Sequence, residues 1–282
     1  MPISNDFEYF KVKSIKEACA LLDKYKGKAK ILAGGTDLIV WLKEDIVTCD
    51  AVIDIKKIKD LDKIELRDGK LFIGALVTFN QLIQSKLVKK EIPILCEASK
   101  TVASKGLRNR ATLVGNICAA VPSCDGAPAL LVYEAEVLVK SSENERVVDI
   151  NKWFAGPKKS CLKSDEIVVG IEIPLSKNAS YGSYHKLGRY KGEDLAQASV
   201  AFLALNNKEY KLACGAVGPV PFRALKTEDK LRNKTLNKKL ISEAKDVLLK
   251  EISPITDIRS SKEYRSHMIG VMFEDACLGG GK

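Results

Sequence analysis

The sequence predicts a mixed α+β fold divided into two domains. Up to residue 175, short apolar stretches alternate with segments of helical periodicity. The last hundred residues instead show a run of strands followed by two helices. The chain has 282 residues, about twice the ~150 residues of a typical domain. We therefore expect a domain at 1–175 and a smaller α+β domain at 176–282, with the boundary in the polar segment 175–180.

Residues 1–57 are expected to form a first lobe. Ser14 is suited to cap a helix that ends at Tyr25, in which Ala18 and Leu22 share one face. An apolar run that starts at Ala29 and a second at 51–55 predict two strands. Strands separated by helices and short connections favour a partly parallel sheet.

Residues 58–175 are expected to form a second lobe. Asp68-Gly69 predicts a hairpin turn between strands at 63–67 and 70–75. Thr78 and Gln81 have the spacing of a capping box, which should open one helix that runs to about Lys89. In order, the remaining elements should be a helix that begins near Pro93, a short helix at 128–133, a hairpin of strands 136–140 and 146–149, and a strand at 168–174.

The last hundred residues are expected to form an antiparallel sheet with helices on one side. The predicted strands are 181–187, 199–205 and 210–217, and the predicted helices are about 236–250 and 261–276.

The stretch 29–41 carries the first candidate site. An apolar strand ends at Gly34-Gly35, and Thr36, which can cap a helix, follows directly. Glycines let the backbone approach a ligand closely, and free N–H groups at the start of a helix favour an anion. A turn of this kind suits a phosphate or a pyrophosphate, although a Gly-Gly turn is more often only a turn.

The stretch 108–125 carries the second candidate site. It combines small residues and Gly115 with the polar side chains of Thr112 and Asn116, and it ends at Asp125. Ordinary loop hydrogen bonds would explain Thr112 and Asn116, and a helix cap would explain Asp125 equally well. The functional interpretation is that this loop faces the first one, so that two sets of backbone N–H groups converge on one pyrophosphate.

Composition narrows the functional classes. The net charge of +10 comes mainly from lysines that are scattered among acidic residues, without an arginine-rich block, so we expect no nucleic-acid binding. Eight cysteines form no Cys-x-x-Cys pair and only two histidines are present, which gives no metal-site spacing. No apolar run reaches the ~20 residues that span a bilayer. We expect a cytoplasmic protein without membrane contact.

Several motifs together resemble the FAD-binding (medium) subunit of the molybdenum hydroxylases, the family of xanthine dehydrogenase and carbon monoxide dehydrogenase. The likeness follows the chain in order and covers nearly all of it. Its motifs are Ala33-Gly34-Gly35-Thr36-Asp37-Leu38, Thr112-x-x-Gly115-Asn116-Ile117, Pro122-x-x-Asp125, Tyr184-x-Lys186-x-x-Arg189, Asp194-x-Ala196, Pro221-x-Arg223 and Asp257-x-Arg259.

The resemblance implies a two-lobed FAD-binding domain, a C-terminal α+β domain, and FAD as cofactor. Asp125 would accept a hydrogen bond from FAD, Ala103 and Val168 would line the flavin or its tail, and Lys186 would lie near the isoalloxazine. The cofactor-binding residues implied in this way are Leu32, Ala33, Gly34, Gly35, Thr36, Asp37, Leu38, Ala103, Thr112, Leu113, Val114, Gly115, Asn116, Asp125, Val168 and Lys186.

One position departs from the family pattern, because Val114 stands where many members have a glycine. A positive φ there would strain a β-branched residue. We expect instead that the Val114 side chain points away from the phosphate, since Gly115 is retained.

The resemblance also implies partners and a reaction. A molybdenum-containing large subunit would oxidise the substrate, a small subunit with two [2Fe-2S] clusters would pass on the electrons, and FAD would deliver them to an acceptor such as NAD. Xanthine or another purine is the expected substrate class. Two alternatives stay open: a free-standing flavin oxidoreductase, and a basic nucleotide- or nucleic-acid-binding module without a redox role.

Overall fold

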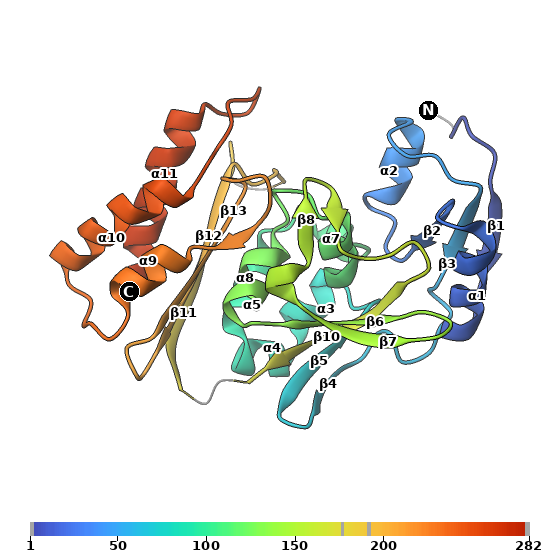
Figure 1. Ribbon diagram of the computed structural model, residues 1–282, viewed down its shortest axis with the longest axis horizontal. Coiled ribbons are helices and arrows are strands. Elements are labelled where there is room, and N and C mark those ends of the chain that lie inside the picture. The colour runs from blue at the N-terminus through green and yellow to red at the C-terminus, as the bar shows by residue number, and fades with distance from the viewer. Residues whose placement is uncertain (1–2, 176–177, 191–192, 280–282) are drawn as a thin grey trace.

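The computed structural model describes residues 3–175, 178–190 and 193–279. Three bodies follow one another along the long axis of the molecule (Figure 1). The N-terminal lobe lies at one end, the second lobe lies in the middle, and the C-terminal domain lies at the other end. The expected boundary at 175–180 includes residues 176–177, which are outside the described residues.

The N-terminal lobe is a three-stranded parallel sheet with two helices, and its strand order is β1-β3-β2. The predicted sheet is present, and both of its strand pairings are parallel where a partly parallel sheet was expected. Ser14 caps α1 as expected, because its side chain accepts a hydrogen bond from the Glu17 amide. The elements are β1 (Glu8–Lys11), α1 (Ile15–Tyr25), β2 (Ala29–Leu32), α2 (Leu38–Lys43) and β3 (Ala51–Asp54).

The second lobe is built on a five-stranded antiparallel sheet with the order β4-β5-β10-β6-β7. Both predicted hairpins are present in it. Its strands are β4 (Ile64–Arg67), β5 (Lys70–Gly74), β6 (Glu136–Lys140), β7 (Glu145–Asp149) and β10 (Ile167–Pro174), with a separate small pair, β8 (Phe154–Gly156) and β9 (Lys159–Ser160).

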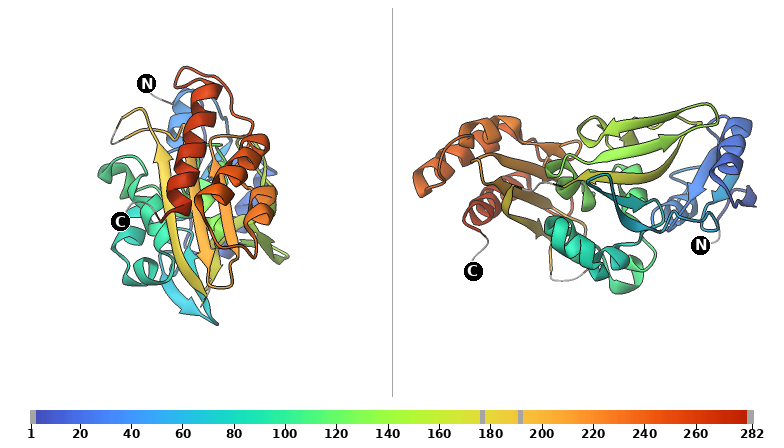
Figure 2. Two further views of the ribbon diagram at one scale, coloured as in Figure 1. Left: turned by 90° about the vertical axis from the view of Figure 1, so that its left-hand side faces the viewer. Right: turned by 90° about the horizontal axis from the view of Figure 1, so that it is seen from below.

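Helices of the second lobe gather on one side of this sheet (Figure 2). They are α3 (Phe79–Gln84), α4 (Lys86–Glu91), α5 (Pro93–Lys100), α6 (Lys105–Arg108), α7 (Leu113–Ala119), α8 (Gly126–Val132) and a 3-10 turn, η1 (Ile150–Lys152). The prediction of one helix from Thr78 to Lys89 was wrong. Ser85 has an extended backbone, ends α3 and caps α4 by accepting a hydrogen bond from the Val88 amide. A serine can stabilise such a break because its hydroxyl satisfies a free helix N–H group.

The C-terminal domain has the expected antiparallel sheet, ordered β11-β12-β13-β14, with helices on its outer face. Its elements are β11 (Ala179–Leu187), β12 (Ala198–Leu205), β13 (Tyr210–Gly215), β14 (Phe222–Arg223), α9 (Leu225–Leu231), α10 (Lys238–Glu251) and α11 (Lys262–Cys277). Helix α9 was not predicted.

Alternate residues of the C-terminal sheet belong to two different cores. On β12, Val200 and Phe202 pack with the C-terminal helices, whereas Ala201 and Leu203 join the core of the second lobe. Tyr184 of β11 pairs in register with Ala201 and faces the second lobe as well. Because side chains alternate along a strand, Lys186 is directed to this same face. The sheet thereby brings C-terminal side chains to the neighbouring domain.

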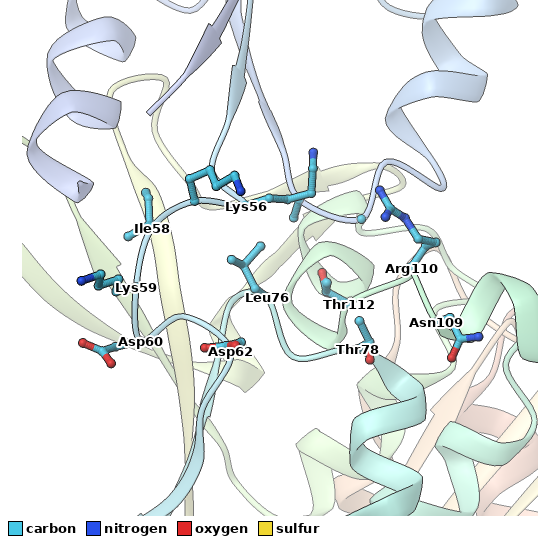
Figure 3. A pocket seen from close by; sticks show the side chains of 13 residues that line it. Lys56, Ile58, Lys59, Asp60, Asp62, Leu76, Thr78, Asn109, Arg110 and Thr112 are labelled. Atoms are coloured by element: carbon cyan, nitrogen blue, oxygen red, sulfur yellow. The ribbon is translucent and has the colours of Figure 1, made fainter. Parts of the chain in front are cut away.

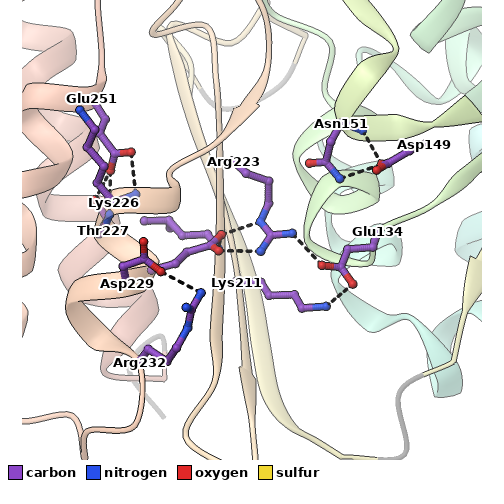
Figure 4. Close-up of polar contacts among 12 residues, drawn as sticks. Glu134, Asp149, Asn151, Lys211, Arg223, Lys226, Thr227, Asp229, Arg232 and Glu251 are labelled. Atoms are coloured by element: carbon purple, nitrogen blue, oxygen red, sulfur yellow. Dashed lines mark hydrogen bonds and ion pairs between the residues drawn. The ribbon is translucent and has the colours of Figure 1, made fainter.

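Ion pairs also join the two domains at the surface. Glu134, between α8 and β6, pairs with Lys211 Nζ at 2.6 Å and with Arg223 at 3.1 Å (Figure 4). Arg223 donates two further hydrogen bonds to the buried Glu228, at 2.5 and 2.6 Å.

Among the described residues, no helix is long and apolar enough to cross a membrane.

Candidate cofactor-binding site

A large cavity of about 870 Å³ lies between the two lobes, and residues of the C-terminal domain also line it. The first lobe contributes residues 33–38, and the second lobe contributes Thr112, Gly115 and Asn116. Arg189 and Arg259 of the C-terminal domain also line it. The two stretches singled out in the sequence therefore face one shared cavity, although they are far apart along the chain.

Gly34 brings the lobes into direct backbone contact. A Cβ atom at this position would lie 2.1 Å from the carbonyl oxygen of Arg110, far inside van der Waals contact. Gly35 has φ +78°, a conformation that favours glycine. The glycine pair therefore has a structural reason as well as a possible ligand-binding one: the first glycine permits the close approach of the lobes, and the second permits the turn.

Backbone donors on both sides of the cavity are free. Within the described parts of the chain, the N–H groups of Gly34, Gly35, Thr36 and Asp37 donate no hydrogen bond, and neither does that of Val114. Unpaired backbone N–H groups are costly to leave without a partner unless water or a ligand accepts from them. Free donors contributed by both lobes suit a diphosphate, which offers acceptor oxygens in several directions.

The expected capping role of Thr36 was wrong. Asp37 holds the N-cap position of α2, and its side chain makes no capping hydrogen bond. Burial raises the pKa of the Asp37 carboxyl above its ordinary value. Both residues line the cavity.

The second stretch is not a loop as expected, because it contains the whole of helix α7. Thr112 caps α7, since its hydroxyl oxygen accepts a hydrogen bond from the Gly115 amide at 3.0 Å. Asn116 Oδ1 accepts from the Gly126 amide at 3.1 Å and from Cys124 Sγ at 3.0 Å, which ties α7 to α8. Val114 lies in the helix, without a positive φ, so no backbone strain arises there. Val114 is only 4% exposed, and it lines the cavity.

Asp125 occupies the N-cap position of α8, but its side chain makes no capping hydrogen bond. Its carboxylate accepts hydrogen bonds from Lys186 Nζ at 2.9 Å and from the Tyr184 hydroxyl at 3.3 Å. Burial raises the pKa of the Asp125 carboxyl to about 6, and the Lys186 ammonium opposes this rise. Asp125 borders the cavity and is 7% exposed.

Lys186 lies behind the cavity wall. Its ammonium donates to Asp125 and to the Thr101 carbonyl oxygen, both at 2.9 Å, and its side chain is 7% exposed. Leu32 and Leu113 are likewise buried, and these three are the implied site residues that do not line the cavity. Ala103 and Val168 do line it.

Several residues of the cavity were not predicted from the sequence. Trp41 lies under Lys158, whose ammonium is 5.8 Å from the ring centre. Arg189, Tyr190 and Arg259 approach from the C-terminal domain. Arg189 and Arg259 belong to motifs that carry the family resemblance, so these motifs could have indicated that the two arginines lie near the cofactor site.

A smaller hollow of about 540 Å³ lies on another side of the contact between the lobes (Figure 3). It shares Gly34 and Thr112 with the large cavity. Lys56 of the first lobe and Arg110 of the second stand at its edge. Lys56 is already paired with Asp54 at 2.8 Å.

A cavity of this size, lined from both lobes and bordered by a glycine pair and a helix start, suits an extended, diphosphate-bearing cofactor. Comparison with known protein families also indicates a cofactor-binding protein of this kind. Residues 5–176 match the FAD binding domain in molybdopterin dehydrogenase, and residues 182–279 match the CO dehydrogenase flavoprotein C-terminal domain.

Individual relatives match over nearly their whole length. The xanthine dehydrogenase FAD-binding subunit of Escherichia coli O157:H7 is 34% identical over 94% of this chain and 92% of its own. The glyceraldehyde dehydrogenase medium chain of Sulfolobus acidocaldarius is 30% identical over 95% of each chain. A chain of carbon monoxide dehydrogenase from Hydrogenophaga pseudoflava superimposes with a TM-score of 0.93, at 30% identity, over 98% of this chain and 97% of its own.

The chain belongs to the family of FAD-binding medium subunits of the molybdenum hydroxylases. Its cofactor is FAD, and its class is that of FAD-dependent oxidoreductase subunits. The residues of the cavity fit this cofactor, because residues that line it from two lobes carry backbone N–H groups without an acceptor in the described chain, and Gly34 and Gly35 have no side chain to separate a ligand from the backbone.

Proposed function

We propose that the cavity holds FAD with its pyrophosphate between residues 33–38 and the first turn of α7. The observation that carries this proposal is that Gly34, Gly35, Thr36 and Val114 line one cavity from two lobes and that their backbone N–H groups have no acceptor among the described residues. In this arrangement Asp125 accepts a hydrogen bond from the cofactor, and Ala103 and Val168 line the flavin or its tail.

We further propose that the protein is the electron-transferring subunit of a three-part enzyme. Its partners are a molybdenum-containing large subunit and a small subunit with [2Fe-2S] clusters. When bound, FAD would supply two-electron redox chemistry between the iron–sulfur clusters and an acceptor such as NAD. The chain's own residues bind and orient the cofactor. Arg189 and Arg259, which line the cavity from the C-terminal domain, favour negative charge there.

The support for a xanthine-type substrate is the 34% identity to a xanthine dehydrogenase subunit. Relatives named for glyceraldehyde and carbon monoxide, at 30% identity, keep aldehydes and carbon monoxide as competing substrates. The substrate pocket belongs to the large subunit in this proposal, so this chain does not select the substrate. The division into domains at 175/176 and the cytoplasmic location are parts of the same proposal.

The first experiment tests the cofactor site. The purified chain should show the visible absorption of oxidised flavin, and heat should release FAD. A colourless protein that takes up no FAD from solution would refute the site, and absorption from bound nucleic acid alone would support the basic-module alternative.

The second experiment tests the partners. The tagged chain, expressed with its neighbouring genes, should copurify with a molybdenum protein and an iron–sulfur protein, and the complex should reduce NAD with xanthine. A yellow protein that is active without partners would favour a free-standing oxidoreductase. Activity with an aldehyde or with carbon monoxide, but not with xanthine, would correct the substrate class.

A further inference from the structure

A buried polar cluster crosses the boundary between the domains at the cavity wall. Asp125 precedes α8 of the second lobe, whereas Tyr184 and Lys186 extend from β11 of the C-terminal domain. The side chains of Lys186 and Asp125 are 7% and 9% exposed, and they meet at 2.9 Å. A buried charge needs such a partner, because losing water is costly for an isolated ion.

Only one member of this cluster reaches the cavity. Asp125 lines it, while Tyr184 and Lys186 lie behind Asp125 and do not. Lys186 also donates to the Thr101 carbonyl oxygen at 2.9 Å, and Thr101 ends α5 just before the cavity residues Val102 and Ala103. One ammonium therefore fixes two separate parts of the cavity wall.

We propose that Lys186 and Tyr184 are positioning residues that act on FAD through Asp125, so that docking of the C-terminal domain completes the cofactor site. This inference rests on the proposed function of the cavity. Lys186 orients the Asp125 carboxylate and favours its ionised form, in which it accepts a hydrogen bond from the cofactor. Tyr184 holds the other carboxylate oxygen.

Coupling of this kind is reciprocal. If the docked C-terminal domain raises the affinity for FAD, bound FAD must stabilise the docked domain by the same free energy. Ligand binding to the folded state also raises thermal stability. Variants that disconnect Lys186 from Asp125 should therefore lose affinity for FAD and also lose part of the thermal stabilisation that FAD provides.

The chain offers a matched control for domain docking. Lys211 extends from β13 of the same sheet and pairs with Glu134 of the second lobe at 2.6 Å, outside the large cavity. Lys186→Met and Lys211→Met each remove one ion pair between the domains. Only Lys186→Met removes one that contacts a cavity residue.

The test is titration of FAD into flavin-free protein, followed by flavin fluorescence. Lys186→Met should weaken FAD binding about tenfold or more, as expected for the loss of hydrogen bonds to a charged group. Lys186→Arg should restore part of the affinity, and Lys211→Met should bind like the wild type. If Lys211→Met loses as much affinity as Lys186→Met, general docking explains the effect and the proposal fails.

A double-mutant cycle separates action through Asp125 from direct contact with FAD. In an Asp125→Asn background, Lys186→Met should have little further effect on the dissociation constant. Additive losses would overturn the proposal and indicate direct contact. If Lys186→Met does not fold, Tyr184→Phe is the variant to use, because it removes only the hydroxyl. It should weaken FAD binding a few-fold. Unchanged affinity would contradict the role of Tyr184. Failure of the wild type to bind FAD would instead refute the proposed function.

Discussion

The backbones of Gly34 and Arg110 are in contact across the boundary between the two lobes, and no side-chain atom fits between them. A Cβ atom on Gly34 would come within 2.1 Å of the Arg110 carbonyl oxygen and 2.8 Å of its carbonyl carbon. Because the obstacle is backbone, a rotamer change cannot relieve the contact. The distance between the lobes, and with it the width of the cofactor cavity, depends on this glycine.

Gly34→Ala should therefore force the lobes apart. We expect a loss of about 1–3 kcal/mol in the free energy of unfolding, as for other overpacked sites, together with loss of bound FAD. Urea unfolding and the flavin absorption of the purified variant measure the two effects. Gly156→Ala is the control, because a Cβ there meets nothing within 4 Å, and it should change stability by less than about 0.5 kcal/mol. Equal behaviour of the two variants would contradict the role of Gly34.

FAD affinity should depend on pH through Asp125. Burial raises the pKa of this carboxyl to about 6. Lys186 and Tyr184 donate hydrogen bonds to it, and Cys124 precedes it in the chain.

If ionised Asp125 accepts a hydrogen bond from FAD, the dissociation constant should be constant above about pH 6. It should rise as pH falls through that value, by at most about tenfold per pH unit for one proton. Fluorescence titrations between pH 5 and 8 provide the measurement. Asp125→Asn should bind weakly with a flat profile, and a variant profile as steep as that of the wild type would assign the pH effect to another group.

Arg146 and Glu166 should protect the second lobe against acid. Arg146 donates two hydrogen bonds to the buried Glu166 carboxylate, at 2.7 and 2.8 Å. These bonds lower the pKa of Glu166 below its ordinary value of 4.5. Because the unfolded chain takes up this proton more readily, the contribution of the pair is present above pH 4.5 and is lost as pH falls below it.

Glu166→Gln should therefore cost about 1–3 kcal/mol in the free energy of unfolding at pH 7. The difference from the wild type should shrink as the pH falls below about 4.5. Urea unfolding at a series of pH values measures it. A difference that stays constant with pH would show that packing, not ionisation, causes the loss.

Arg223→Leu should destabilise the C-terminal domain strongly. Among the described residues, the buried Glu228 would keep only the Leu212 amide at 2.8 Å as a hydrogen-bond donor, so an uncompensated charge would stay in the interior. We expect a cost of about 3–5 kcal/mol, measured by thermal or urea unfolding. Arg232→Leu is the control, because Arg232 pairs with Asp229 on the exposed surface and should cost at most about 1 kcal/mol (Figure 4).

Local patterns in the sequence were sufficient for most elements. Asp68-Gly69 specified a hairpin, and Ser14 specified a helix start, because both act through bonds and dihedral angles within a few residues. The same local rules were insufficient at Ser85, where one expected helix became two, and at α9, which has no strong start signal. At these places packing against the rest of the domain decides between local alternatives of similar energy.

The sequence by itself determined the family, the glycine stretches and the cofactor class, because these depend on residue types at fixed short spacings. Only the tertiary structure decided which of those residues meet. Asp125 and Lys186 are 61 positions apart, and only the face that β11 presents to the second lobe makes them partners. Likewise, no local rule relates Gly34 to Arg110. Contacts between residues distant in sequence depend on how whole sheets and lobes pack, so the role of Lys186 behind the cavity wall emerges only from the folded molecule.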